Sequence, residues 1–291
     1  LEVMKNDGPW VLPADVDKVN FLTQYTLDLK DTEIKTTLTV YDNNWNSTDQ
    51  IPQRQVLSGA MGSFGYVDPS LGGDSSRLNM VFGLSNDSYS AGLYISRYKL
   101  NLFGNFTYFQ EDPVNGDSHE QVDRRWIYGG HFEFRRELTS SVNLRVGTDL
   151  RSDQIGEVSL HSVENRIRLK LVRQDSVDWL SLGVFAELEI DISDKLRGLF
   201  GVRTDYSDYD VLSNLSDNSG RGSDDIWLPS IGFAYEVGSF GEVYLNWGKG
   251  FHSNDVRGAT IAFDPLSNKE LEPVALFSGQ DGAEVGYRIE R

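Results

Sequence analysis

The chain of 291 residues is strongly acidic, with 44 Asp and Glu residues against 27 Lys and Arg residues and a formal net charge of −17. Phosphate recognition needs a basic surface, so we expect no nucleic-acid partner. The sequence has no cysteine, which excludes disulfides, thiolate catalysis and thiolate metal sites.

Short and long connections between candidate strands alternate along the chain. The short ones fall at residues 31–32, 86–87, 138–140, 192–194 and 238–240. The long ones fall at residues 43–74, 111–124, 153–178, 207–224 and 252–281. In an up-and-down antiparallel sheet, neighbouring hairpins close at opposite rims. The alternation therefore predicts a sheet with one rim of tight turns and one rim of long loops.

The candidate strands alternate apolar and polar residues. In residues 196–206 the even positions are mostly apolar, and the odd positions include Arg197, Arg203 and Asp205. Residues 142–151, 180–191 and 283–290 show the same alternation, and successive side chains of a strand point to opposite faces. A soluble antiparallel sheet with one face on a core would have the same pattern. If the sheet crosses a membrane, the residues expected to face lipid are Phe200, Val202, Leu144, Val146, Val285 and Tyr287.

Strand length and aromatic residues favour the membrane over the soluble sheet. Several strands keep the alternation for about ten residues, the length that a tilted strand needs to cross a bilayer. Aromatic residues gather near strand ends, as in the aromatic girdles of membrane barrels: Trp126, Tyr128, Trp179, Tyr206, Tyr209, Trp227, Tyr244 and Trp247. We therefore predict an all-β fold, an up-and-down antiparallel transmembrane β-barrel segment of about twelve strands that forms one domain over residues 1–291.

The two ends of the chain lack features expected of a complete exported protein. Residues 1–10 carry no signal peptide, and the chain starts in a Gly-Pro loop and stops at Arg291 inside a candidate strand. We expect the sequence to be a segment of a longer protein.

Several sequence motifs, in order along nearly the whole chain, resemble those of TonB-dependent outer-membrane receptors. They are WNSTDQIPQR (45–54), DPSLGG (68–73), YKLNLFGNFTYFQEDPVNGD (98–117), HEQVDRR (119–125), GFHSNDVRGAT (250–260) and GAEVGYR (282–288). The resemblance implies a barrel of roughly twenty-two strands closed by an N-terminal plug domain. The present residues look like the middle and late part of that barrel, without the plug, the segment that engages the energy-coupling protein, or the closing C-terminal strand.

The resemblance also implies a function and a location. Such receptors lie in the outer membrane of Gram-negative bacteria and import scarce nutrients such as iron–siderophore complexes, cobalamin or oligosaccharides. The expected partners are outer-membrane lipid, the nutrient or siderophore ligand, and a TonB-type energy-coupling protein that acts through the plug region. We expect the long loops at the cell exterior and the tight turns at the periplasm. Two alternatives are also compatible with the sequence, a soluble all-β carbohydrate-binding module and a passive porin-like channel.

The sequence offers little support for an enzyme or for a metal site. The sequence has no G-x-S-x-G, H-E-x-x-H, P-loop or G-x-G-x-x-G motif, so we expect no enzyme activity and no cofactor. The four histidines, His119, His131, His161 and His252, are scattered, and we expect no metal site from them. Asp112, Asn115 and Asp117 could offer oxygens to calcium, although an Asn-Gly-Asp turn explains them better.

Glu187, Glu189 and Asp191 share one strand face. Paired carboxylates on one strand could suggest a glycosidase, but the opposed geometry that such an enzyme needs does not follow from one strand. We instead expect a hydrated wall of the lumen in which Arg197 and Arg203 on the next strand balance these carboxylates.

Aromatic and basic residues in three expected loops are the candidates for ligand binding. Arginine clamps carboxylates with a forked pair of donors, and tryptophan stacks on sugars and aromatic chelators. The alternative is that these side chains tie the loops to one another or to the plug. The candidate ligand-binding residues are Trp45, Arg54, Arg124, Arg125, His252, Asn254 and Arg257.

Overall fold

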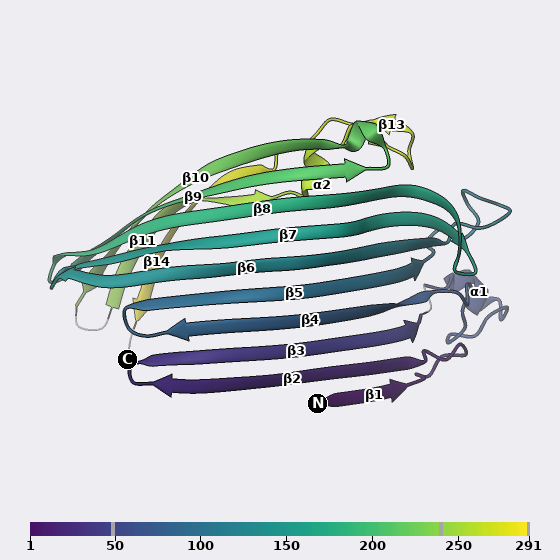
Figure 1. Cartoon of the computed structure of the whole chain (residues 1–291), viewed down its shortest axis with the longest axis horizontal. Coiled ribbons are helices and arrows are strands. Elements are labelled where there is room, and N and C mark those ends of the chain that lie inside the picture. The colour runs from purple at the N-terminus through teal and green to yellow at the C-terminus, as the bar shows by residue number, and fades with distance from the viewer. Residues whose placement is uncertain (48–49, 239–240, 290–291) are drawn as a thin grey trace.

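The computed structural model describes residues 1–47, 50–238 and 241–289, in which one antiparallel sheet of 12 strands dominates (Figure 1). Each strand pairs with the next along the chain, except that β11 pairs with β14. The strands of this sheet are β1 (Glu2–Asn6), β2 (Val16–Leu29), β3 (Thr32–Asn46), β4 (Gly72–Ser85), β5 (Tyr89–Gly104), β6 (His119–Thr139), β7 (Val142–Glu164), β8 (Ile167–Ser193), β9 (Leu196–Ser213), β10 (Gly220–Val237), β11 (Gly241–Ser253) and β14 (Phe277–Ile289).

The sheet is curled and open among the described residues. In Figure 1, β2 to β8 form a broad wall, and β11 and β14 turn behind it. The edges are β1 and β14, which do not pair with each other. None of the helices in the described part of the chain is long and apolar enough to cross a membrane. The fold is therefore a partial cylinder wall, as the alternating strands predict.

The connections at one rim are short and those at the other rim are mostly long. The short rim joins β2 to β3, β4 to β5, β6 to β7, β8 to β9 and β10 to β11, close to the five predicted breaks; Ser239 and Phe240 of the last break lie outside the described residues. The opposite rim carries the small elements α1 (Gln53–Leu57), η1 (Ser216–Asn218), α2 (Val256–Ala259), β12 (Phe263–Asp264) and β13 (Lys269–Glu270).

The predicted long connection at residues 153–178 is wrong. Strand β7 continues to Glu164 and β8 begins at Ile167, so a two-residue turn joins the two longest strands. Asn165 and Arg166 have φ angles of 51° and 64°, the left-handed values that such a hairpin turn needs at both central residues. The connection predicted at 207–224 is likewise shorter, because β9 extends to Ser213 and β10 starts at Gly220.

One face of the wall is apolar and exposed. Val202, Val285 and Tyr287, three of the six residues expected to face lipid, are 42%, 74% and 52% exposed. Phe200 of the same set packs edge-on against Phe233, with ring centroids 5.8 Å apart. A water-soluble domain would bury such a face, so its exposure across many strands marks a surface made for an apolar environment.

The other face is polar, and we call it the inner face because the loop between β11 and β14 folds against it. Val256 of α2 and Leu276 form a buried cluster there with Ile155, Val177 and Val211 of β7, β8 and β9. This small core anchors the loop to the long-loop end of the wall.

Candidate functional site

Charged pairs on single strands line the inner face. Arg151 donates to Asp153 in β7 over 2.6 Å, and Arg203 donates to Asp205 in β9 over 2.7 Å. Residues two apart in a strand point to the same face, which is why this spacing brings each pair together. The carboxylates of Asp153 and Asp205 are almost fully buried, and hydrogen-bonded partners are what make buried charge tolerable.

Gly183 gives Arg203 a second partner on a different strand. Nη1 of Arg203 donates to Asp149 of β7 over 2.8 Å, passing over Gly183 of the intervening strand β8. A Cβ at Gly183 would clash with Nη2 of Arg203, so a side chain at this position would displace the guanidinium from its present bridge. The expectation that Arg203 balances the β8 carboxylates is therefore wrong, because Asp149 and Asp205 occupy its guanidinium.

Near the tight turns the ion pairs run between strands, and we call this set the rim network. Arg145 of β7 contacts Glu133 of β6 at 2.9 Å and Glu187 of β8 at 3.4 Å. Arg197 contacts Glu189 at 3.5 Å, as expected from the sequence. The members of the network that link β6, β7, β8, β9, β11 and β14 are Glu133, Arg145, Glu187, Glu189, Arg197, Glu242 and Arg288. Arg135 also contacts Glu133, within β6. These contacts pair carboxylates with guanidinium groups across the inner face.

Arg125 and Arg257, two of the candidate ligand-binding residues, lie in one charged group on the inner face. Nε of Arg125 donates to Asp123 over 2.7 Å, and Nη2 of Arg257 donates to Asp255 over 2.6 Å. Burial alone would raise the pKa of Asp255, but the hydrogen bond and the charge of Arg257 outweigh it, and the charge of Arg125 adds to them, so this pKa is lowered. Burial would lower the pKa of Arg257, yet the Asp255 carboxylate and the more distant Asp175 and Asp123 raise it.

The sequence placed Arg124 and Arg125 in a loop, but both lie in β6, which begins at His119. Neighbouring residues of a strand face opposite ways, so Arg124 lies on the apolar face while Arg125 lies on the inner face. Arg124 contacts Glu157 of β7 at 3.6 Å. The two arginines therefore cannot act on one ligand from the same side of the wall.

The other candidate ligand-binding residues are spread over the long-loop rim. Trp45 lies near the end of β3, opposite Gly73, and Arg54 is exposed on α1; residues 48–49 between them lie outside the described residues. His252 lies in β11 opposite Ser278. Asn254 ties the ends of the β11–β14 loop together, because its side-chain amide donates to the carbonyl of Ala275 over 2.7 Å. That contact is the architectural role which the sequence left open.

Asp112 and Asp117 act as turn acceptors in the loop between β5 and β6. Asp112 accepts the backbone N–H groups of Val114 and Asn115, each at 2.9 Å. Asp117 accepts those of Gln110 and Asp112. Within the described ranges, no cluster of three His, Asp or Glu side chains has the geometry to hold a metal ion. The oxygens that could bind calcium are thus committed to the turn.

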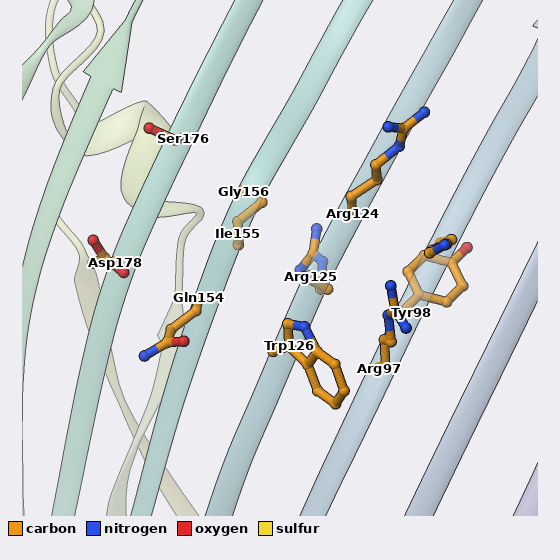
Figure 2. A pocket seen from close by; sticks show the side chains of 11 residues that line it. Arg97, Tyr98, Arg124, Arg125, Trp126, Gln154, Ile155, Gly156, Ser176 and Asp178 are labelled. Carbon is orange, nitrogen blue, oxygen red and sulfur yellow. The ribbon is translucent and has the colours of Figure 1, made fainter.

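A pocket of about 490 Å³ opens between β5, β6, β7 and β8. Figure 2 shows its lining residues on these adjacent strands, among them Arg97, Arg124, Trp126, Gln154 and Asp178. All five are on the opposite side of their strands from the inner-face residues. Cross-strand pairing aligns four of them, Arg97, Trp126, Gln154 and Asp178, in one row. The pocket therefore opens mainly on the apolar side of the wall, above the exposed apolar residues.

Sequence reasoning missed the carboxylates that hold the candidate arginines. Asp123, Asp175 and Asp255 each lie two residues from an arginine, and Asp175 accepts from Nε of Arg173 on β8 over 3.1 Å. An acidic and a basic residue two apart on the polar face of a strand would have been a usable signal for these pairs.

A curved wall of twelve antiparallel strands, with an exposed apolar face, a charged inner face and unequal rims, defines the membrane-spanning part of a β-barrel. The family profile described as TonB dependent receptor-like, beta-barrel, matches residues 9–279. The chain belongs to this family of TonB-dependent receptor barrels, which are transporters and not enzymes and which reside in the outer membrane of Gram-negative bacteria. Receptors of the family take up siderophores, metals and other scarce nutrients and couple to TonB.

Solved structures agree with the fold. The ferric citrate transporter FecA is 10% identical with a TM-score of 0.66, over 82% of this chain and 36% of its own. The FrpB iron transporter from Neisseria meningitidis is 12% identical with a TM-score of 0.64, over 100% of this chain and 46% of its own. The ferric yersiniabactin uptake receptor FyuA from Yersinia pestis is 11% identical with a TM-score of 0.62, over 100% of this chain and 46% of its own. The chain thus spans less than half of each solved receptor. No curated protein matches it.

Proposed function

We propose that this chain forms part of the wall of a receptor that imports a scarce nutrient, such as a siderophore complex, cobalamin or an oligosaccharide, with energy supplied through TonB. The observation that carries the proposal is the family match over residues 9–279, joined to a charged inner face that could line a transport path. The names of the solved relatives include iron and copper transporters, which supports a chelated metal as one class of cargo.

The ligand would first meet the long-loop end of the inner face. Arg125, His252, Asn254 and Arg257 lie on or next to the strands and loop that build this end, and Trp45 and Arg54 lie on the connection from β3 to β4. Arg124 leaves this set, because it lies on the opposite face of β6. Since Arg125 and Arg257 are already paired with carboxylates, an anionic ligand would have to share or displace Asp123 or Asp255.

Uptake should be measured with the full receptor in a host that lacks its own receptor for the tested nutrient. The expected result is growth on the dilute nutrient that disappears when the inner-membrane energy source is removed. Growth that is independent of that source would contradict energy-coupled import and indicate a passive channel.

Ligand binding should be measured separately on whole cells with matched surface abundance. Arg125→Gln and Arg257→Gln should each weaken the binding of an anionic chelate by about 1.5 to 3 kcal/mol, the range for a lost charged hydrogen bond. Arg221→Gln is the matched control, because Arg221 also pairs with a carboxylate, Asp210 at 2.7 Å, but alternates onto the apolar face. Unchanged affinity in both test variants would assign these arginines to the architecture of the wall.

A further inference from the structure

Three basic side chains gather on the apolar side of a strongly acidic protein. Arg97 and Lys99 on β5 and Arg124 on β6 are exposed and line the pocket between β5 and β8. Cross-strand pairing sets Lys99 beside Arg124 and Arg97 beside Trp126. Two carboxylates lie nearby: Glu157, which contacts Arg124 at 3.6 Å, and Asp178 in the pocket lining. Among the described residues, Arg97 and Lys99 form no ion pair.

These basic residues lie directly above the apolar surface of the same strands. Toward the tight-turn rim, every second residue of β5 after Arg97 is apolar, first Ile95 and then Leu93. In the same direction along β6, Arg124 is followed by Trp126 and Tyr128. The rings of Trp126 and Tyr128 stack with centroids 6.2 Å apart, and the guanidinium of Arg97 lies 5.2 Å from the centre of Trp126. Stacked aromatics between charged and apolar residues are typical of the boundary between headgroups and acyl chains.

An apolar groove of about 450 Å³ continues below the aromatic pair. It exists because Gly130 has no side chain, while Leu93 and Leu150 stand beside it on β5 and β7. Tyr128 and Phe132 close the groove along β6. A Cβ at Gly130 would lie 2.8 Å from the carbonyl oxygen of Gly92, so the glycine is required and the groove stays open.

The basic pocket and the apolar groove together fit a molecule that has an anionic phosphate group and an apolar chain. The rows of Arg97 and Gly130 are four residues apart on the paired strands, about 13 Å at about 3.3 Å per residue. Arginine and lysine supply several charge-assisted donors to phosphate oxygens. The site lies toward the long-loop rim, because Arg124 is close to the start of β6 and far from the tight turn after Thr139.

We propose that this surface binds a phosphorylated lipid of the outer leaflet, with its phosphate held by Arg97, Lys99 and Arg124 and an acyl chain in the Gly130 groove. The occupant is a lipid and not a free anion, because the groove adds an apolar contact that phosphate alone cannot use. Glu157 and Asp178 limit the net positive charge of the pocket, so binding depends on the directed donors more than on long-range attraction.

The test uses the full receptor in a neutral detergent and native mass spectrometry to measure bound lipid. The probes are phosphatidylglycerol and phosphatidylcholine with identical acyl chains. The test variant is Arg124→Gln, and the matched control is Arg136→Gln, an exposed arginine on the same face of β6 beside the tight turn. A triple variant that also carries Arg97→Gln and Lys99→Gln repeats the test, and a thermal melt confirms that each variant is folded.

The expected result is tighter retention of phosphatidylglycerol than of phosphatidylcholine. Each basic residue near an anionic lipid surface contributes about 1 kcal/mol, so Arg124→Gln should weaken phosphatidylglycerol binding about fivefold and the triple variant about a hundredfold, while Arg136→Gln leaves it unchanged. Equal retention of the two lipids, or equal losses in the test and control variants, would overturn the proposal. Displacement of the lipid by millimolar inorganic phosphate would replace it with a simple anion site.

Discussion

Replacing Val202 by arginine tests which face of the wall meets lipid. Val202 lies in β9 between Ala186 of β8 and Pro229 of β10, with 42% of its surface exposed on the apolar face. It is six residues past Leu196, where β9 begins at the tight-turn rim. Six residues span about 20 Å of strand, or about 14 Å across a bilayer at a tilt of about 45°. Val202 therefore lies near the midplane.

An arginine at this depth on the lipid face should cost about 2 to 4 kcal/mol of folding stability. A value of about 3 kcal/mol corresponds to a change of more than about 100-fold in the folding equilibrium constant. The control is Leu199→Arg on the same strand but on the inner face, opposite Glu189 and Gly232. There the guanidinium meets water and a carboxylate, so the expected cost is below about 1 kcal/mol.

The free energy of unfolding should be measured by reversible denaturant titration of the full receptor in phospholipid vesicles. The difference between the two variants is the informative quantity, because both introduce the same side chain on one strand. A cost for Leu199→Arg that exceeds the cost for Val202→Arg would mean that the assignment of the two faces is inverted.

Three further predictions concern the rims and edges of the wall. A cysteine in place of exposed Ser267, in the β11–β14 loop, should react with a membrane-impermeant thiol reagent on intact cells, and one in place of Ser140 at a tight turn should not; the reverse result would invert the orientation. The 291-residue chain expressed alone should aggregate, because β1 and β14 leave open edges, and a monodisperse monomer in detergent would contradict this. The N–H of Asn115 lowers the pKa of Asp112, so this turn is stabilised above the unfolded value of about 4 and loosens as pH falls through the lower folded value. The protection of the Asn115 amide against hydrogen exchange, measured relative to the intrinsic exchange rate at the same pH, should therefore fall in acid, and Asp112→Asn should remove that pH dependence.

The alternation of apolar and polar residues predicted the number of strands and the two faces of the wall, because a barrel strand alternates lipid-facing and lumen-facing residues over its whole length. It failed at the hairpin of β7 and β8. Register shifts between Ile155 and Val158 and beyond Leu160 break the two-residue pattern, so the continuing strand looked like a loop. The turn also escaped notice, because Arg166 occupies a left-handed position where glycine is the usual signal.

The candidate site was less predictable, because side-chain partners depend on which residues the register places together. The sequence singled out Arg125 and Arg257 for their donors, but it could not reveal that Asp123 and Asp255 already accept from them. Arg124 was grouped with Arg125 only because β6 was expected to begin later than His119. One shifted strand boundary was enough to place a residue of the apolar face among the candidate ligand-binding residues.

The two arrangements of charge on the inner face give the wall different mechanical behaviour at its two ends. Farther from the tight turns, the Arg151–Asp153 and Arg203–Asp205 pairs lie within single strands, so sliding one strand past its neighbour leaves them intact. The contact between Arg203 of β9 and Asp149 of β7 is the exception among the pairs described above. At the tight turns, the rim network crosses the seams between strands, and the same shear would pull its ions apart. Shear applied at the turn side would therefore have to separate several ion pairs between strands, whereas farther from the turns it would act on the backbone hydrogen bonds and on fewer ion pairs between strands, such as Arg203–Asp149.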